Sequence, residues 1–573
     1  MATPPGELAV VAHTHLPYLK NHGVWPVGEE WLFEAWAGSW LPLTEMLQRL
    51  AADGLRDVLT LGVTPLVAHQ VADPRLRRDV GTWIGSQMWR AEEQRSLHAS
   101  LGEDVVELGT FYWRHYARLL ELHERIEEEG GLLTAWAELE RGGIIELLGG
   151  PATHPYLPLE WDPAFIDAQL ACGLDDHARW ARGRPAGLWA PEMGYRPRGQ
   201  VADATATPRS VDRHGTPELP RSGPELPGLE EHYERAGITH FLVDAATLVR
   251  AAGGADRDWT RRPESPDPAA GDPYEVVHDG VLVGESDVVA FARDLSVAYH
   301  VWSPTAGYPG KAWYRDFHAR GSYGVHPSWR VTDKELEPHE KEPYVPDAAA
   351  AQVQADVEHF HGVVRSVLDP RPGELVVAAY DTELFGHWWF EGVRWLEEVL
   401  RRVAADPALR TTTVRSRLER RPPTRRLELP ESSWGYAKGH ASWVTPETRP
   451  MWRTLAAVRE QVQSSPALTT ADPTVAAQIA RELALASSSD WPFMVSRGKA
   501  PDYAHARLRE HAGRVRELCD ELERGGDAVS LAAAMASTDD APRDPGAIAA
   551  ALVPDHNPAP LSLVGEDERE GPS

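Results

Sequence analysis

The stretch VVAAYDTELFGHWWFEG, residues 376–392, joins a short apolar run to a cluster of functional side chains. Its first residues have the length and apolarity of a buried parallel strand. The run ends at Asp381, which is followed by Glu383 and by the paired tryptophans Trp388 and Trp389. A helix start could use the two acids to complement its dipole, but it would not need the tryptophans. We therefore interpret this stretch as a strand whose carboxyl end carries a functional carboxylate.

Six further apolar runs of similar length precede the run that ends at Asp381. Most of the gaps between the runs have helical periodicity, as in Trp40–Ala51, Ala164–Ala181 and Ala351–Leu368. Strands that alternate with helices in this way favour a parallel α/β architecture. The fold class predicted is thus α/β, a (β/α)7 barrel. Its expected strands are Leu8–Ala12, Val58–Gly62, Ile144–Leu148, Gly187–Ala190, Ile238–Val243, Val288–Ala292 and Leu375–Tyr380.

A polar side chain follows each of these runs. In a barrel of βα units the strands direct their last residues into one mouth, where the active site forms. Any one of these residues could simply cap the next helix, because Asp and Thr are common caps. The complete set indicates a polar mouth, and its members are His13, His15, Thr64, His154, Glu192, Asp244, Arg293, Asp294 and Asp381.

Two of the strand ends carry carboxylates in aromatic surroundings. Glu192 lies in LWAPEMGYRP beside Trp189 and Tyr195, and Asp381 precedes the tryptophan pair. Two carboxylates in one mouth suit glycoside chemistry, in which one attacks the anomeric carbon or stabilises its charge while the other protonates the leaving oxygen. A separation of about 5–5.5 Å would indicate a retaining mechanism. An ion-paired or helix-capping glutamate is the structural alternative for Glu192.

Three histidines form the second candidate set. His13 and His15 in HTHLPY are two residues apart on one strand, so both rings can face the mouth. His154 in GGPATHPY could supply a third nitrogen. The three side chains could bind a metal or hydrogen-bond to sugar hydroxyls, and the pattern alone decides for neither.

The composition limits the partners. The net charge is −28, which repels phosphate backbones and anionic lipid, so nucleic-acid and membrane-surface functions are not expected. Two cysteines, Cys172 and Cys519, cannot form a cysteine-based metal site or a disulfide framework. No signal peptide or membrane-length apolar run occurs, and we expect a cytoplasmic protein. The 22 tryptophans fit either an indole-rich core or a groove that stacks on sugars.

The remaining segments suggest the domain organisation. The barrel is expected over residues 1–405, with a helical insertion at 66–140 and flexible inserts at 198–227 and 252–273, which are rich in Pro, Gly and charge. A helical C-terminal domain is predicted over 406–524. Residues 525–573, rich in Ala, Asp and Pro, are predicted to be a mobile tail.

Seven ordered motifs together resemble glycoside hydrolase family 57 and, within it, the 1,4-α-glucan branching enzymes. The similarity spans about residues 7–520 and leaves out the two inserts and the tail. The motifs are HTHLPY (13–18), ELLGGPATHPY (146–156), WAPEMGYRP (189–197), FARD (291–294) with VWS (301–303), YDTELFGHWW (380–389), SSWGYAKGHASW (432–443) and SSSDWPFMVSRGKAPDYAHARLREH (487–511).

The resemblance implies that an α-1,4-glucan is cleaved and the released segment is transferred to a 6-hydroxyl. It assigns the nucleophile to Glu192 and the general acid/base to Asp381. It implies no cofactor and no metal, and it leaves the oligomeric state open. The residues expected to bind substrate are His13, His15, His154, Arg293, Trp302, Trp388, Trp434 and Trp443.

Two departures from the family leave alternatives open. Branching enzymes carry a tyrosine in a loop after the fifth strand, but Ala245–Pro273 contains none, and Tyr274 and Trp259 are the nearest candidates. The segment Gln200–Pro227 also diverges. If the loop fails to exclude water, an α-amylase-like hydrolase results, and a 4-α-glucanotransferase is possible on the same scaffold. A metal-dependent carbohydrate hydrolase or deacetylase and a non-catalytic glucan-binding protein are the other hypotheses.

Overall fold

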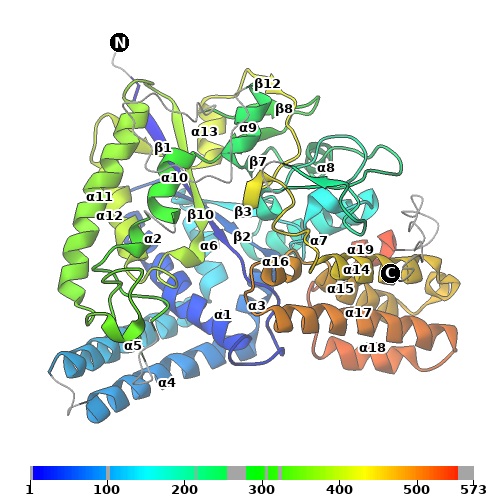
Figure 1. Ribbon diagram of the computed structural model, residues 1–573, viewed down its shortest axis with the longest axis horizontal. Coiled ribbons are helices and arrows are strands. Elements are labelled where there is room, and N and C mark those ends of the chain that lie inside the picture. The colour runs from blue at the N-terminus through cyan, green and yellow to red at the C-terminus, as the bar shows by residue number, and fades with distance from the viewer. Residues whose placement is uncertain are drawn as a thin grey trace, which may run out of the picture.

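A computed structural model describes residues 4–98, 103–212, 216–253, 279–303, 307–319 and 326–552 of the chain. Its centre is a curled sheet of seven parallel strands in the order β10-β1-β2-β3-β4-β7-β9 (Figure 1). All seven predicted strands are present, which confirms the predicted fold class. They are β1 (Gly6–Thr14), β2 (Leu59–Val63), β3 (Ile145–Gly149), β4 (Gly187–Leu188), β7 (His240–Val243), β9 (Val289–Ala292) and β10 (Leu375–Asp381).

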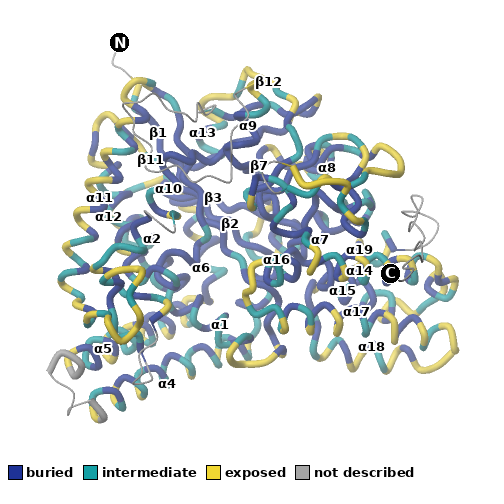
Figure 2. Tube along the Cα trace, in the orientation of Figure 1, coloured by how far each residue is buried: buried dark blue, intermediate teal, exposed yellow. Residues whose placement is uncertain are grey.

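These strands form because their apolar runs are covered on both faces. All nine residues of β1 are buried, as are all five of β2 and of β3, and Figure 2 shows the sheet as the dark centre of the molecule. Strands β10 and β9 stand at opposite ends of this strand order, yet they come close together in space. The backbone N–H of Asp294, just after β9, donates to the carbonyl of Val377 in β10 at 2.7 Å. The sheet therefore curls far enough to bring all the strand ends to one mouth.

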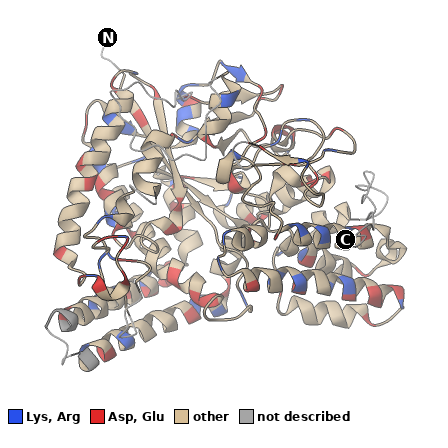
Figure 3. Ribbon diagram, in the orientation of Figure 1, with Lys and Arg blue, Asp and Glu red and all other residues tan. Residues whose placement is uncertain are grey.

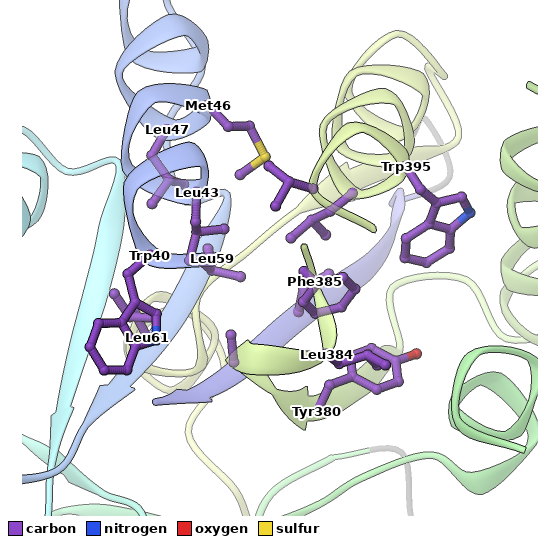
Figure 4. Close-up of a cluster of buried hydrophobic side chains, with 14 of the residues drawn as sticks. Trp40, Leu43, Met46, Leu47, Leu59, Leu61, Tyr380, Leu384, Phe385 and Trp395 are labelled. Atoms are coloured by element: carbon purple, nitrogen blue, oxygen red, sulfur yellow. The ribbon is translucent and has the colours of Figure 1, made fainter. Parts of the chain in front are cut away.

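Helices cover the outside of the curled sheet. Figure 4 shows how α2 (Leu41–Ala52) and α12 (Gly392–Ala404) pack leucine and tryptophan side chains against β2 and β10. Burying an aliphatic side chain of this kind contributes about 1.5–3 kcal/mol. The other barrel helices are α1 (Glu29–Ala35), α7 (Pro163–Ala181), α8 (Leu229–Arg235), α9 (Ala245–Ala251), α10 (Leu295–Trp302) and α11 (Pro346–Leu368).

The segment predicted as a helical insertion, 66–140, contains four helices. They are α3 (Pro65–Ala72), α4 (Pro74–His98), α5 (Glu103–Glu128) and α6 (Leu132–Arg141). The long helices α4 and α5 lie side by side along the lower edge of the barrel in Figure 1. Helix α5 is joined to the rest of the barrel where the Tyr112 hydroxyl donates to the carbonyl of Pro327.

The boundary predicted at residue 405 is too early. Strand β11 (Leu409–Thr411) pairs with β1, and β12 (Arg426–Leu427) pairs with β8 (Val281–Val283), so this stretch belongs to the barrel. Its strands were missed because they are only two or three residues long. Between them lies α13 (Val414–Arg420), and the helical domain begins with α14 (Arg449–Ser464) and continues through α15 (Pro473–Ala486), α16 (Asp490–Ser496) and α17 (Pro501–Glu523).

The prediction of a mobile tail from residue 525 is wrong for residues 525–552. This stretch forms α18 (Ala528–Ala536) and α19 (Gly546–Ala551), which pack on α15 and α7. Between the two helices, Asp540 accepts hydrogen bonds from Lys20 at 2.7 Å and Tyr18 at 2.7 Å. The alanine-rich composition that suggested disorder instead gives short helices with small buried faces. Residues 553–573 lie outside the described part of the chain.

The segment 198–227 was expected to be a flexible insert, but its described residues form a folded-back loop. β5 (Ser210–Val211) pairs with β6 (Pro217–Glu218), and further bridges join Gly199 to Leu226 and Ala202 to Arg221. Ala202 and Leu219 pack into the core of the helical domain. The second insert, 252–273, falls outside the described residues from position 254 onward.

Charged residues lie mainly on the outer helices, whereas the central strands are almost free of them (Figure 3). Among the described helices, none combines the length and the apolar content that crossing a bilayer requires.

Candidate active site

Glu192 lies directly after β4 in the short 3-10 turn η3 (Pro191–Met193) and is almost fully buried. Its backbone has φ 61°, and Met193 has φ 48°, a conformation that side chains with a Cβ rarely adopt. Such strain is held where the surroundings impose it, as they often do at functional sites. One carboxylate oxygen accepts from Trp434 Nε1 at 2.7 Å and the other from Ser489 Oγ at 2.8 Å. Burial raises the pKa of Glu192, while these two hydrogen bonds oppose that rise.

A chain of hydrogen bonds runs from the histidines to Glu192. Because Ser489 gives its proton to Glu192, its oxygen must accept from His154 Nδ1, 3.0 Å away. The other nitrogen of His154 is then an acceptor, and His13 Nε2 donates to it at 3.2 Å. Burial lowers the pKa of both imidazoles well below the usual value, so both rings are neutral, as this arrangement requires. The hydrogen bonds of this chain therefore all donate in one direction, from His13 through His154 and Ser489 to Glu192.

His15 has a different partner in the same cluster. Its Nε2 lies 3.1 Å from the carboxylate of Asp490, and its Nδ1 lies 3.2 Å from Thr64 Oγ1. Burial alone would lower the pKa of His15, but the carboxylates of Asp490, Glu192 and Asp381 together outweigh burial and the pKa is raised. His15 is thus the member of the cluster that can carry a positive charge in the mouth.

The histidine cluster also has the dimensions of a metal site, since the ring nitrogens of His13, His15 and His154 lie within 4.8 Å of one another. Hydrogen bonds to Ser489, Asp490 and Thr64, and the one between the His13 and His154 rings, already account for five of the six nitrogens. A cation held by Nε2 of both His13 and His154 would have to break the hydrogen bond between these two atoms. The donor set therefore fits hydrogen bonding better than metal binding.

Asp381 ends β10 and faces the same mouth. Burial, and then the negative charge of Glu192, raise the pKa of Asp381 to about 7, so at neutral pH it holds a proton for about half of the time. Glu383 lies two residues further on in the 3-10 turn η7 (Thr382–Leu384), where it accepts from Trp40 Nε1 at 2.8 Å. Burial and the charge of Asp381 raise the pKa of Glu383 well above its usual value. Acid–base catalysis needs one ionised and one protonated carboxyl group, and Glu192 and Asp381 are suited to these two states.

Arg293 and Asp244 meet at the ends of β9 and β7. Arg293 Nε donates to Asp244 Oδ2 at 2.8 Å, and the same oxygen accepts from Lys438 Nζ at 3.1 Å. The Arg293 guanidinium also lies over the Trp434 ring, 5.5 Å from its centre. Its charge lowers the pKa of Asp381, in opposition to Glu192. Arg293 therefore belongs to the mouth, as the sequence predicted.

The predicted aromatic residues fall into two groups. Trp302 and Trp388 are neighbours, with ring centres 5.6 Å apart, and Trp302 is 46% exposed, so the pair offers an open aromatic surface. Trp434 lies edge-on to Trp189, which stacks on His13. The indoles of the first group are thus accessible to a ligand, and those of the second group form the wall behind Glu192.

The structure disagrees with the expectation that Trp443 binds substrate. This side chain is fully buried and stacks on Tyr156, with ring centres 4.2 Å apart and an angle of 12° between the planes. It packs in the core of the helical domain, behind the turn that carries Trp434. Trp443 supports the site from behind because its ring has no exposed face.

Three residues of the site were not predicted. Ser489 and Asp490 come from the start of α16, in the helical domain, and contact Glu192 and His15 on the barrel. Lys438 comes from the loop before that domain. The run SSSDW is a visible sequence signal, because it places hydroxyls and an acid before a helix, but it does not reveal which strand ends they reach.

A barrel mouth with a buried Glu–Asp pair, a histidine cluster and an aromatic surface is the site of an enzyme that works on glycosidic bonds. The chain belongs to glycoside hydrolase family 57, whose profile matches residues 9–430. A second profile, for the C-terminal region of 1,4-alpha-glucan branching enzymes, matches residues 452–541. Both findings confirm the resemblance found in the sequence.

Similar proteins of known name support the same family assignment. The chain is 36% identical over 553 residues to a probable 1,4-alpha-glucan branching enzyme of Mycobacterium tuberculosis, which covers 91% of this chain and 93% of that protein. The solved GH57-type branching enzyme of Pyrococcus horikoshii is 31% identical, with a TM-score of 0.82 over 97% of this chain and 98% of that one. The branching enzyme of Thermococcus kodakaraensis, solved in complex with glucose and additives, is 30% identical, with a TM-score of 0.84 and the same coverage.

Proposed function

We propose that the protein is a 1,4-α-glucan branching enzyme that works by retaining double displacement. The observation that carries the proposal is the bond from Ser489 to Glu192. Ser489 lies within the region that matches the branching-enzyme C-terminal profile, and Glu192 lies within the family 57 region. The region that matches the branching-enzyme C-terminal profile therefore contacts the assigned nucleophile itself.

In the first step, the Glu192 carboxylate attacks the anomeric carbon of an α-1,4-linked glucose while Asp381 protonates the departing 4-oxygen. The direction of the pKa shift at Asp381 supports this division of roles, because the group holds a proton near neutrality. The bonds from Trp434 and Ser489 favour the ionised form of Glu192. The products of the step are a glycosyl ester on Glu192 and a shortened glucan.

In the second step, Asp381 acts as a base. Formation of the ester removes the negative charge of Glu192, which is one cause of the raised pKa of Asp381. The pKa of Asp381 then falls, and the carboxylate can take the proton of an incoming 6-hydroxyl. Attack by that hydroxyl releases Glu192 and forms the α-1,6 branch.

The partner in this proposal is a neutral α-1,4-glucan such as amylose or a glycogen-like polymer. Trp302 and Trp388 would stack on its sugar rings, and His13, His15, His154 and Arg293 would bind hydroxyls in the mouth. A neutral polymer also suits a chain with a net charge of −28, which disfavours anionic partners. A role in glycogen synthesis and a cytoplasmic location accompany the proposal as predictions.

A linkage assay tests the proposal. Purified protein is incubated with amylose, and α-1,6 linkages are measured by proton NMR in the same sample in which new reducing ends are counted. We expect the linkages to exceed the new reducing ends severalfold, and Glu192→Gln to abolish both while leaving glucan binding intact. Reducing ends without α-1,6 linkages would identify a hydrolase, and a changed chain-length distribution without branches would identify a 4-α-glucanotransferase.

A further inference from the structure

The turn that presents Trp434 to Glu192 has an unusual backbone. It contains the 3-10 turn η8 (Tyr436–Lys438), in which Ala437 has φ 56° and Lys438 has φ 60°. Two consecutive residues with a Cβ in the left-handed region are strained and persist only where surrounding contacts impose the conformation. The turn is closed by the N–H of Lys438, which donates to the Gly435 carbonyl at 3.1 Å. Some interaction must therefore compensate for this conformation.

Lys438 provides such an interaction. Its side chain is buried, and its ammonium group donates to Asp244 Oδ2 at 3.1 Å. Asp244 is fully buried at the end of β7 and also accepts from Arg293. A buried carboxylate with two cationic donors is a fixed point of the barrel, since each group would be costly to leave unpaired. Lys438 thereby ties the strained turn to a strand end.

The turn that Lys438 anchors also contacts the assigned nucleophile, Glu192, through Trp434. Trp434 contacts Glu192 twice, through its indole Nε1 at 2.7 Å and through its backbone N–H, which donates to the Glu192 carbonyl at 3.0 Å. On the other side of Trp434, Ser432 Oγ lies 2.7 Å from Thr247 Oγ1 on α9. The tryptophan is thus held between two anchors, and both reach the β7–α9 unit.

We propose that Lys438 is a positioning residue, which holds the Trp434 turn against the barrel so that the indole N–H keeps its hydrogen bond to Glu192. The inference rests on the proposed function of Glu192 as nucleophile. Lys438 acts through Trp434 and touches no reacting atom. Removing its charge would free the turn to relax from the left-handed conformation, and the hydrogen bond that favours ionised Glu192 would weaken.

The charged groups that face the ammonium are Asp244, Arg293 and Arg250. The two arginines repel it, whereas Asp244 attracts it. Replacement of Lys438 by methionine therefore leaves the pair between Asp244 and Arg293 in place and removes the repulsion from both arginines. This substitution is expected to preserve the fold, because methionine fills the same volume as the lysine stem without a charge.

The test compares Lys438→Met, Trp434→Phe and the double variant in the pH dependence of kcat/KM for amylose, with thermal unfolding as a check of folding. The acidic limb reports the ionisation of the nucleophile. Each single variant is expected to move that limb upward by about one to two pH units, the effect of one lost hydrogen bond to a charged group. The double variant is expected to match Trp434→Phe alone, because both changes remove the same bond. The exposed Lys499→Met is the matched control and is expected to leave the limb in place.

An unchanged acidic limb in folded, active Lys438→Met, or shifts that add in the double variant, would overturn the inference. If Lys438→Met does not fold, Asp244→Asn removes the other end of the tie and is judged by the same criterion. A wild-type protein without activity on glucans would instead refute the proposed function, so the two failures are distinguishable.

Discussion

Replacing Ser489 by alanine tests whether the helical domain is part of the catalytic site. The hydroxyl makes a 2.8 Å hydrogen bond to Glu192 and accepts another, at 3.0 Å, from His154. A hydrogen bond to a charged group contributes about 1.5–3 kcal/mol, and one pKa unit corresponds to about 1.4 kcal/mol. The loss should therefore raise the pKa of Glu192 by about one to two units and lower kcat/KM by about tenfold or more below pH 6.

The assay is the pH profile of kcat/KM on amylose, measured by iodine staining and by branch linkages. Ser487→Ala is the matched control, because Ser487 belongs to the same serine run but donates to the Leu483 carbonyl at 2.8 Å, away from Glu192. An acidic limb that stays within about 0.3 pH units of wild type in folded Ser489→Ala would show that the hydroxyl does not affect the ionisation of Glu192.

Three further predictions concern carboxyl groups whose pKa the protein shifts. The raised pKa of Glu383 favours its protonated form, which an amide resembles. Glu383→Gln should therefore keep activity within about threefold, whereas Glu383→Ala should lose about tenfold; equal losses in kinetic assays would contradict this. Because the folded-state pKa of Asp381 is raised to about 7, its ionisation between about pH 4 and 7 costs stability, so Asp381→Asn should raise Tm at pH 8 and not at pH 4; calorimetry at both pH values decides. Hydrogen bonds from His69, Lys20 and Tyr18 hold the pKa of Asp540 far below its usual value, so its contribution to stability is present above about pH 4 and is lost below it. Asp540→Asn should therefore lower Tm at pH 7, and the difference from wild type should shrink at pH 3. An equal difference at both pH values would contradict that interpretation.

The strands and strand-end residues could be predicted because both follow from local patterns. A run such as Leu8–Ala12 has one stable environment, a sheet covered on both faces, and the residues after parallel strands must share one edge. This is why Glu192, Asp381, Arg293 and the histidines could be assigned to one mouth. Short strands such as β11 and β12 carry no such pattern, and their pairing depends on neighbours far away in the sequence.

Contacts between domains could not be predicted for the same physical reason. Ser489 and Asp490 are almost 300 residues from Glu192, and nothing in the run SSSDW specifies which strand end it will meet. The burial of Trp443 could not be predicted either, because an indole suits a sugar-binding groove as well as it suits a core. The folded conformation of residues 525–552 depends on charged contacts, such as that of Asp540 with Lys20, which the composition does not reveal.

Trapping the covalent intermediate tests most directly the claim that Glu192 attacks and Asp381 transfers the proton. The Asp381→Asn variant is incubated with an α-maltosyl fluoride, whose leaving group needs no acid, and the protein is analysed by peptide mass spectrometry. A maltosyl ester is expected on Glu192, and it should persist because no base activates the acceptor. A label on another residue, or unlabelled Glu192 in a variant that still consumes the fluoride at the wild-type rate, would contradict the claim.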